Sequence, residues 1–76
     1  MIEIWKIECE WDSNIVDSMQ EWIEKAGVDT EKLVGRTNSE EEAKWTMEQL
    51  SQFKEEINYG DGRIYQRYYE IRILDT

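Results

Sequence analysis

Residues 2–11 alternate between apolar and charged side chains, and this alternation constrains the fold more than any other feature of the chain. The apolar face of the segment carries Trp5, Ile7, Cys9 and Trp11, and the polar face carries Lys6, Glu8 and Glu10. Ile2 and Ile4 lie at the start of the otherwise polar face. A period of two residues with one apolar face predicts a half-buried β-strand, which needs a sheet and a covering layer.

Residues 14–26 repeat their apolar side chains with the period of an amphipathic helix. The apolar stripe consists of Ile15, Val16, Met19, Trp22, Ile23 and Ala26. This stripe is about 120° wide at 100° per residue. Ser13 or Asn14 can cap the start of the helix by accepting backbone hydrogen bonds, and Gly27 stands where a left-handed C-cap residue belongs.

Residues 40–57 predict a second helix. Ser39 and Glu42 form the pattern of a capping box, in which each side chain accepts a hydrogen bond from the backbone N–H of the other residue. The carboxylates of the first turn also complement the helix dipole. The apolar face of this helix is expected to hold Ala43, Met47, Leu50, Phe53 and Ile57.

The chain then turns at residues 58–62, and residues 63–74 predict a long strand rich in tyrosine and isoleucine. The alternation of this strand is imperfect. One predicted face holds Tyr65, Tyr69, Ile71 and Ile73, and the other holds Ile64, Tyr68 and Leu74. A bulge near Tyr68 would reconcile the two sets.

The segment 28–38 fits two structures, because residues 32–37 form either a short third strand or a loop. A strand there gives the order βαβαβ, which permits a parallel sheet, whereas a loop gives βααβ with antiparallel outer strands. We favour βααβ because parallel strands covered on both faces are almost continuously apolar, and residues 2–11 keep a polar face. The predicted fold is one small acidic α+β domain over residues 1–76, with two helices packed on one face of a two- or three-stranded sheet.

The residue types argue against catalysis. The chain has no histidine, the usual neutral-pH base, and its one cysteine, Cys9, lies on the apolar face of a predicted strand. We interpret Cys9 as a buried packing residue. Without histidine or a second cysteine a transition-metal site is not expected, and no phosphate-binding loop pattern occurs. We therefore expect no enzyme activity, no metal and no cofactor.

The charge balance indicates the kind of partner. Eighteen acidic and nine basic residues give a net charge of −9, which repels nucleic acid and anionic membranes and attracts basic protein surfaces. No apolar run approaches the ~18 residues of a membrane span. Met1 leads directly into the alternating segment, so we expect no signal peptide and a cytoplasmic location. A compact acidic product of this kind is typical of viruses and mobile elements.

The predicted helices carry acidic ridges on the sides opposite to their apolar stripes. The ridge residues are Asp17, Glu21 and Glu24 on the first helix and Glu41, Glu48, Glu55 and Glu56 on the second. Trp45 lies about 140° from the centre of the apolar stripe of its helix, among these carboxylates. An exposed tryptophan among carboxylates resembles a binding anchor with a polar rim, although Trp45 could instead pack against the segment 28–38 or the turn at residues 58–62. Mimicry of a nucleic acid would need both helices, because each ridge is sparse.

Two further surfaces involve the predicted strands. Arg63, Arg67 and Arg72 alternate with tyrosines, a mixture that occurs on nucleic-acid-binding sheets, but pairing with the carboxylates of residues 2–11 explains them better. Ile2, Ile4, Ile64 and Leu74 would form an apolar outer patch on a two-stranded sheet. A second copy could cover that patch and form a homodimer.

These observations favour an intracellular protein-binding module. It is expected to act as an inhibitor or regulator that occupies a basic surface on a larger protein, such as a surface that binds nucleic acid. The alternative is a self-associating structural or accessory protein that uses the face or edge of its sheet.

Overall fold

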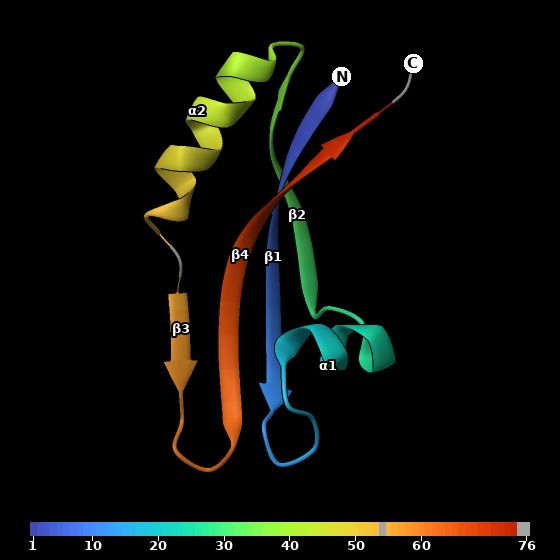
Figure 1. The fold of residues 1–76 in the computed structure, drawn as a ribbon, viewed down its shortest axis with the longest axis vertical. Coiled ribbons are helices and arrows are strands. Elements are labelled where there is room, and N and C mark those ends of the chain that lie inside the picture. The colour runs from blue at the N-terminus through green and yellow to red at the C-terminus, as the bar shows by residue number, and fades with distance from the viewer. Residues whose placement is uncertain (54, 75–76) are drawn as a thin grey trace.

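The computed structural model describes residues 1–53 and 55–74, and over these residues the chain is an α+β fold with two helices and one four-stranded antiparallel sheet. The elements are β1 (Ile2–Asp12), α1 (Met19–Ala26), β2 (Thr30–Thr37), α2 (Glu40–Ser51), β3 (Glu55–Asn58) and β4 (Arg63–Ile73). The strand order in the sheet is β2-β1-β4-β3 (Figure 1).

The centre of the sheet is the pair β1 and β4. They run antiparallel from Ile2 opposite Ile73 to Asp12 opposite Arg63, and the register is unbroken. The bulge expected near Tyr68 is therefore absent from this pairing. The sheet bulge lies in β2 instead, where Val34 has no partner because Ile4 faces Gly35 and Trp5 faces Leu33.

The predicted order of elements is wrong in two respects. Residues 32–37 do form a strand, within β2, so the favoured βααβ order is not observed. This strand pairs antiparallel with β1, so the parallel sheet that βαβαβ would permit is not observed either. In addition, β3 adds a fourth strand on the far side of β4. The antiparallel direction of the two long strands is as predicted.

One face of the sheet, called the first face here, carries the apolar residues predicted for β1. Ile7, Cys9 and Trp11 are buried on it, and Ile64 lies directly opposite Trp11. Val16, Met19 and Trp22 complete the α1 core around Trp11 and Ile64. The indole Nε1 of Trp11 donates to the Gln66 side chain at 2.7 Å, so its buried polar group is satisfied.

The opposite, second face is covered by α2 at the other end of the sheet. Ile2 and Ile4 are buried there, and Ala43 of α2 is buried close to Ile2. The prediction that both helices pack on one face is therefore wrong. The unbroken pleat explains the result, because it points Trp11 and Ile2 to opposite faces, and each apolar group needs its own helix. Figure 1 shows α1 and α2 at opposite ends of the molecule.

The first helix begins later than predicted because the residues before it form a turn. The Asp12 side chain accepts a hydrogen bond from Asn14 N at 2.8 Å, and the Asn14 side chain donates to the carbonyl of Asp61. The N-cap is Ser18, whose hydroxyl accepts from Glu21 N, so neither Ser13 nor Asn14 caps the helix. Gly27 ends α1 as predicted, with φ of 78° and its N–H donating to Ile23 O.

The second helix ends earlier than predicted, at Ser51 rather than at residue 57. Phe53 N donates to Leu50 O, a tight turn that ends the helical ladder. Glu55 and Ile57 then pair with β4 as part of β3. Phe53 and Ile57, which the periodicity assigned to the apolar helical face, are 60% and 40% exposed, and residue 54 lies outside the described residues.

We expect Val16→Ala to lower the free energy of unfolding by about 2 kcal/mol, because this side chain is buried in the α1 core. Ile15→Ala is the matched control. Ile15 is 66% exposed, so its truncation should change stability by no more than about 0.5 kcal/mol. Urea unfolding followed by tryptophan fluorescence measures both variants. Equal losses would contradict the structure and favour a longer helix in which both residues share one apolar stripe.

Candidate functional site

Trp45 lies on the outer surface of α2 and is 62% exposed. Ala43, two residues earlier, is buried toward the sheet, so a rotation of 100° per residue turns Trp45 away from it. Glu41 and Glu48 are exposed on the same side of the helix. The structure therefore places Trp45 with Glu41 and Glu48 on the exposed side of α2, which is one of the placements that the sequence left open. We call these three residues the Trp45 surface.

The N-terminus of α2 fixes the direction of this surface. Ser39 is the N-cap, and its hydroxyl accepts from Glu42 N at 3.2 Å, which is one half of the predicted capping box. In the other half of a capping box, the Glu42 carboxylate would accept from Ser39 N. Here the Thr37 hydroxyl accepts from Ser39 N instead and donates to the Glu42 carboxylate. The last residue of β2 therefore ties α2 to the sheet.

Glu55 and Glu56 do not belong to the Trp45 surface, because α2 ends before them. The Glu55 carboxylate lies 3.4 Å from Arg67 Nη2, and the Glu56 carboxylate accepts a hydrogen bond from the Gln66 side chain at 3.3 Å. The predicted seven-residue ridge from Glu41 through Glu48 to Glu55 is therefore interrupted after its second member.

The acidic residues of the first helix lie far from α2. Asp17 precedes α1, and its N–H donates to the Glu21 carboxylate. Glu21 also lies 3.6 Å from Lys25, while Glu24 is exposed. Since α1 and α2 occupy opposite ends of the sheet (Figure 1), their carboxylates do not form one continuous acidic surface.

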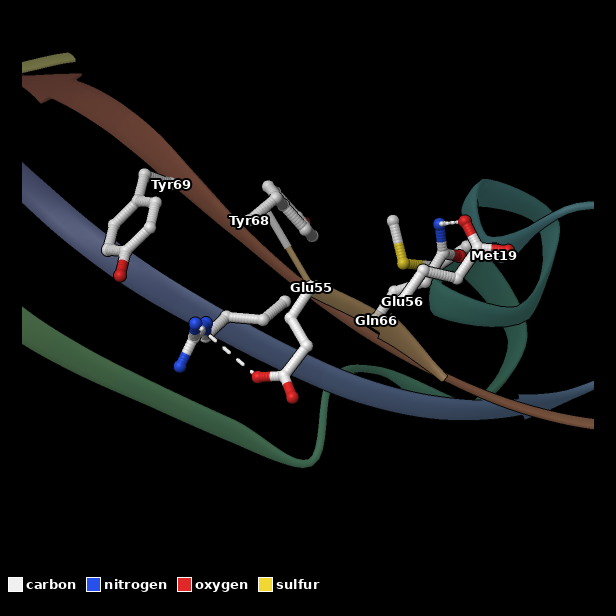
Figure 2. Close-up of a pocket in the computed structure, with 7 residues that line it drawn as sticks. Met19, Glu55, Glu56, Gln66, Tyr68 and Tyr69 are labelled. Atoms are coloured by element: carbon white, nitrogen blue, oxygen red, sulfur yellow. Dashed lines mark hydrogen bonds and ion pairs between the residues drawn. The ribbon is translucent and has the colours of Figure 1, made fainter. Parts of the chain in front are cut away.

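A pocket of about 390 Å³ lies between α1, β3 and β4. Figure 2 shows Met19 and Glu56 at one side of it, Tyr69 at the other and Tyr68 between them. Burial raises the pKa of the Tyr68 phenol. Glu55 and Glu56 are engaged within the chain, and Arg67 Nη2 pairs with Glu55 and donates to Phe53 O. Arg67 Nε is buried without a hydrogen-bond partner among the described residues. The pocket therefore offers a ligand mainly apolar and phenolic contacts.

A second hollow, which we call the α2 groove, lies between α2 and the end of β4 and has a volume of about 290 Å³. Its apolar lining consists of Ile2, Ala43, Ile71 and Ile73, and its exposed charged lining consists of Glu40, Glu41 and Lys44. Sequence reasoning missed the groove. Ile71 and Ile73 share one face of the predicted strand, and the antiparallel register places them beside Ile4 and Ile2. This alternation was the sequence signal that could have indicated the groove.

The β4 arginines are paired within the molecule, but mostly with carboxylates outside β1, where the sequence placed their partners. Arg63 reaches Glu10 of β1 at 4.0 Å and Asp61 at 2.9 Å. Arg72 Nη2 lies 2.7 Å from Glu31 and 3.1 Å from Glu70, and its guanidinium stacks 4.7 Å from the Trp5 ring centre. These pairings neutralise the cations that a nucleic-acid-binding sheet would direct at phosphates.

A polar network continues along the second face away from α2. The Tyr65 hydroxyl donates to the Glu8 carboxylate at 2.5 Å, and Lys6 Nζ lies 3.5 Å from the same carboxylate. The hydrogen bond from Tyr65, reinforced by the charge of Lys6, lowers the pKa of Glu8. The same hydrogen bond raises the pKa of Tyr65 to about 12. This part of the face is stabilised by polar contacts rather than by a covering element.

The predicted self-association patch does not exist as one surface. Ile2 and Ile4 are buried on the second face, whereas Ile64 is buried on the first face beside Trp11. Leu74 is the member of the set that remains substantially exposed, at 42%. The prediction assumed a sheet without cover on its outer face, and α2 provides that cover for Ile2 and Ile4.

The described part of the chain has no helix that is both long and apolar enough to cross a membrane. Within the same residues, no three Cys, Asp or Glu side chains are placed to hold a metal ion. Cys9 is fully buried, and burial raises the pKa of its thiol. Comparisons with protein-family models, curated proteins and solved structures find no match to this chain.

We expect Tyr65 to lose its phenolic proton near pH 12 in the folded protein. Because this pKa is raised above the unfolded value of about 10, the stabilisation from Tyr65 is complete below about pH 10 and is lost as the pH rises through about 12. A tyrosinate absorbance titration of the wild type minus Tyr65→Phe isolates this group. Glu8→Gln should move the transition down toward pH 10. A wild-type transition already at pH 10 would contradict the Tyr65–Glu8 hydrogen bond.

Proposed function

We propose that this chain is a small acidic protein-binding module, an inhibitor or regulator that occupies a basic surface of a larger protein. The observation that carries the proposal is the 62% exposure of Trp45 between the exposed carboxylates of Glu41 and Glu48. A large aromatic side chain with most of its surface in solvent contributes little to the core of the fold. Covering it in a complex would remove its apolar area from water.

The physical logic is that of an anchor with a polar rim. A tryptophan that fills a pocket on a partner contributes most of its binding energy at the centre of the contact. The carboxylates around it speed the encounter with a basic surface and orient the approach. The net charge of −9 acts in the same direction at longer range.

The acidic surface available for this contact belongs to one helix. Glu41 and Glu48 are two helical turns apart, about 10.5 Å, whereas duplex DNA presents a charge every ~1.7 Å along its axis. We therefore propose recognition by an anchor and a few carboxylates. Occupation of a nucleic-acid-binding surface remains part of the proposal, but it does not require a copy of the phosphate spacing.

A second candidate function, self-association as a structural or accessory protein, rests on a separate observation. Ile73 is 72% exposed and Leu74 is 42% exposed at the end of β4. A second copy would bring its own charge of −9 to this contact, so the association would be opposed at low salt.

We expect Trp45→Ala to weaken binding of the partner by at least about 2 kcal/mol, roughly 30-fold, while leaving stability nearly unchanged. Tyr59→Ala is the matched control, because Tyr59 is a 48% exposed aromatic residue on the turn before β4. The partner is captured from host extract on immobilised wild-type protein, purified, and its affinity for each variant measured by biolayer interferometry. A loss of stability above ~3 kcal/mol for Trp45→Ala, or equal affinities for wild type and variant, would contradict the anchor.

A charge-matched pair of double variants tests which helix meets the partner. Glu41→Gln with Glu48→Gln, and Asp17→Asn with Glu24→Gln, each remove two exposed negative charges. We expect only the α2 pair to slow association and to flatten its dependence on salt. Stopped-flow association at low and high salt measures both effects. Equal effects of the two pairs would indicate long-range attraction without a specific acidic contact.

A further inference from the structure

We infer that the α2 groove is a second docking site, which takes an aliphatic side chain flanked by lysine or arginine from the same basic partner that receives Trp45. The inference rests on the proposed function and adds the chemistry of the segment that is recognised. Three observations support it. The groove has an apolar wall and a small volume, its two carboxylates form no ion pair with another described residue, and it lies next to the Trp45 surface.

The groove presents an apolar wall to solvent. Ile2 and Ala43 are buried at its base, while Ile71 and Ile73 are 37% and 72% exposed. Ile73 is the most exposed of the large apolar side chains in the described residues. Contact between this wall and an aliphatic side chain would remove apolar area from water on both partners.

The size of the groove limits the occupant to a small part of a chain. A volume of about 290 Å³ corresponds to roughly ten water molecules. It lies at the lower end of the ~300–1,000 Å³ typical of small-molecule sites. One large aliphatic side chain with its flanking backbone fits this volume better than a helix or an extended drug-sized ligand does.

The carboxylates of the groove select a basic occupant. Neither Glu40 nor Glu41 forms an ion pair with another described residue, in contrast to Glu31, Glu55 and Glu70 on the sheet, which pair with arginines. A lysine or arginine next to the inserted side chain would meet these carboxylates. A second copy is disfavoured as the occupant, because it brings the same carboxylates and the same net charge of −9.

The groove and the Trp45 surface are continuous at Glu41. Glu41 lines the groove and is also exposed on the side of the helix that carries Trp45. A partner that buries Trp45 can therefore contact the groove as well, because Glu41, near the N-terminal end of α2, belongs to both surfaces. Lys44 also lines the groove, so two carboxylates and one ammonium give its lining a net charge of −1, which still favours a basic flanking residue over an acidic one.

The test uses two end-blocked synthetic peptides, Lys-Leu-Lys-Leu-Lys and Glu-Leu-Glu-Leu-Glu, which have the same apolar content and opposite charge. Each peptide is titrated into the full chain labelled with nitrogen-15. We expect the lysine peptide alone to shift the backbone resonances of Ala43, Lys44, Ile71 and Ile73. Ile73→Ser should weaken this binding about tenfold, without loss of stability because Ile73 is exposed. Ile15→Ser, at the α1 end, is the matched control and should bind as the wild type does.

The outcomes separate this inference from the proposed function. Shifts outside the groove, equal shifts with the acidic peptide, or no effect of Ile73→Ser would overturn the docking site, whatever Trp45→Ala does to the captured partner. Groove shifts that grow with protein concentration alone, and more strongly at high salt, would assign the groove to a second copy and also overturn it. If the lysine peptide binds as expected while Trp45→Ala leaves partner affinity unchanged, the groove stands and the Trp45 anchor fails.

Discussion

The unbroken antiparallel pairing of β1 with β4 is the constraint on which the other elements depend. With Ile2 opposite Ile73 and Asp12 opposite Arg63, the pleat assigns every side chain of both strands to one of two faces. The apolar residues then gather at opposite ends of opposite faces. One helix cannot cover both groups, so α1 packs on Trp11 while α2 packs near Ile2. On each face, the half of the sheet that lies away from the helix is left uncovered. Polar contacts are needed on these uncovered halves.

The uncovered halves of the sheet are stabilised by paired charges and hydrogen bonds. On the second face Tyr65 donates to Glu8, and on the first face the buried Glu3 carboxylate accepts from Trp5 Nε1 and Arg36 Nε. Buried or half-buried charges require such partners, because an unpaired one carries a large desolvation cost. The sheet therefore uses its own arginines internally. The carboxylates of Glu41 and Glu48 near Trp45 form no ion pair with another described residue, so they remain available to a partner.

The elements that the sequence predicted well are those with a local signal. The two-residue period of residues 2–11, the Ser39 cap and the Gly27 C-cap are each confirmed, since each depends on residues close together in the chain. The end of α2 had no such signal, because neither glycine nor proline follows Ser51. Pairing of β3 with β4, six to twelve residues away, overrode helix propensity there. Likewise, Asp12 and the turn at Asp61 hold Asn14 out of the helix through contacts that no short window of sequence contains.

The candidate site follows the same division between local and distant information. Helical rotation placed Trp45 off the apolar stripe of its helix, but it left open whether the side chain packs against residues 28–38 or faces solvent, as it does. The groove required the register that places Ile73 beside Ile2. One consequence concerns stability. The α1 core lies at the opposite end of the sheet from α2 (Figure 1), so residues of the proposed binding surface share no contacts with the cluster around Trp11. Substitutions in the two regions should therefore act independently. A small domain with little stability to spare can in this way keep a large apolar side chain in solvent without weakening its core.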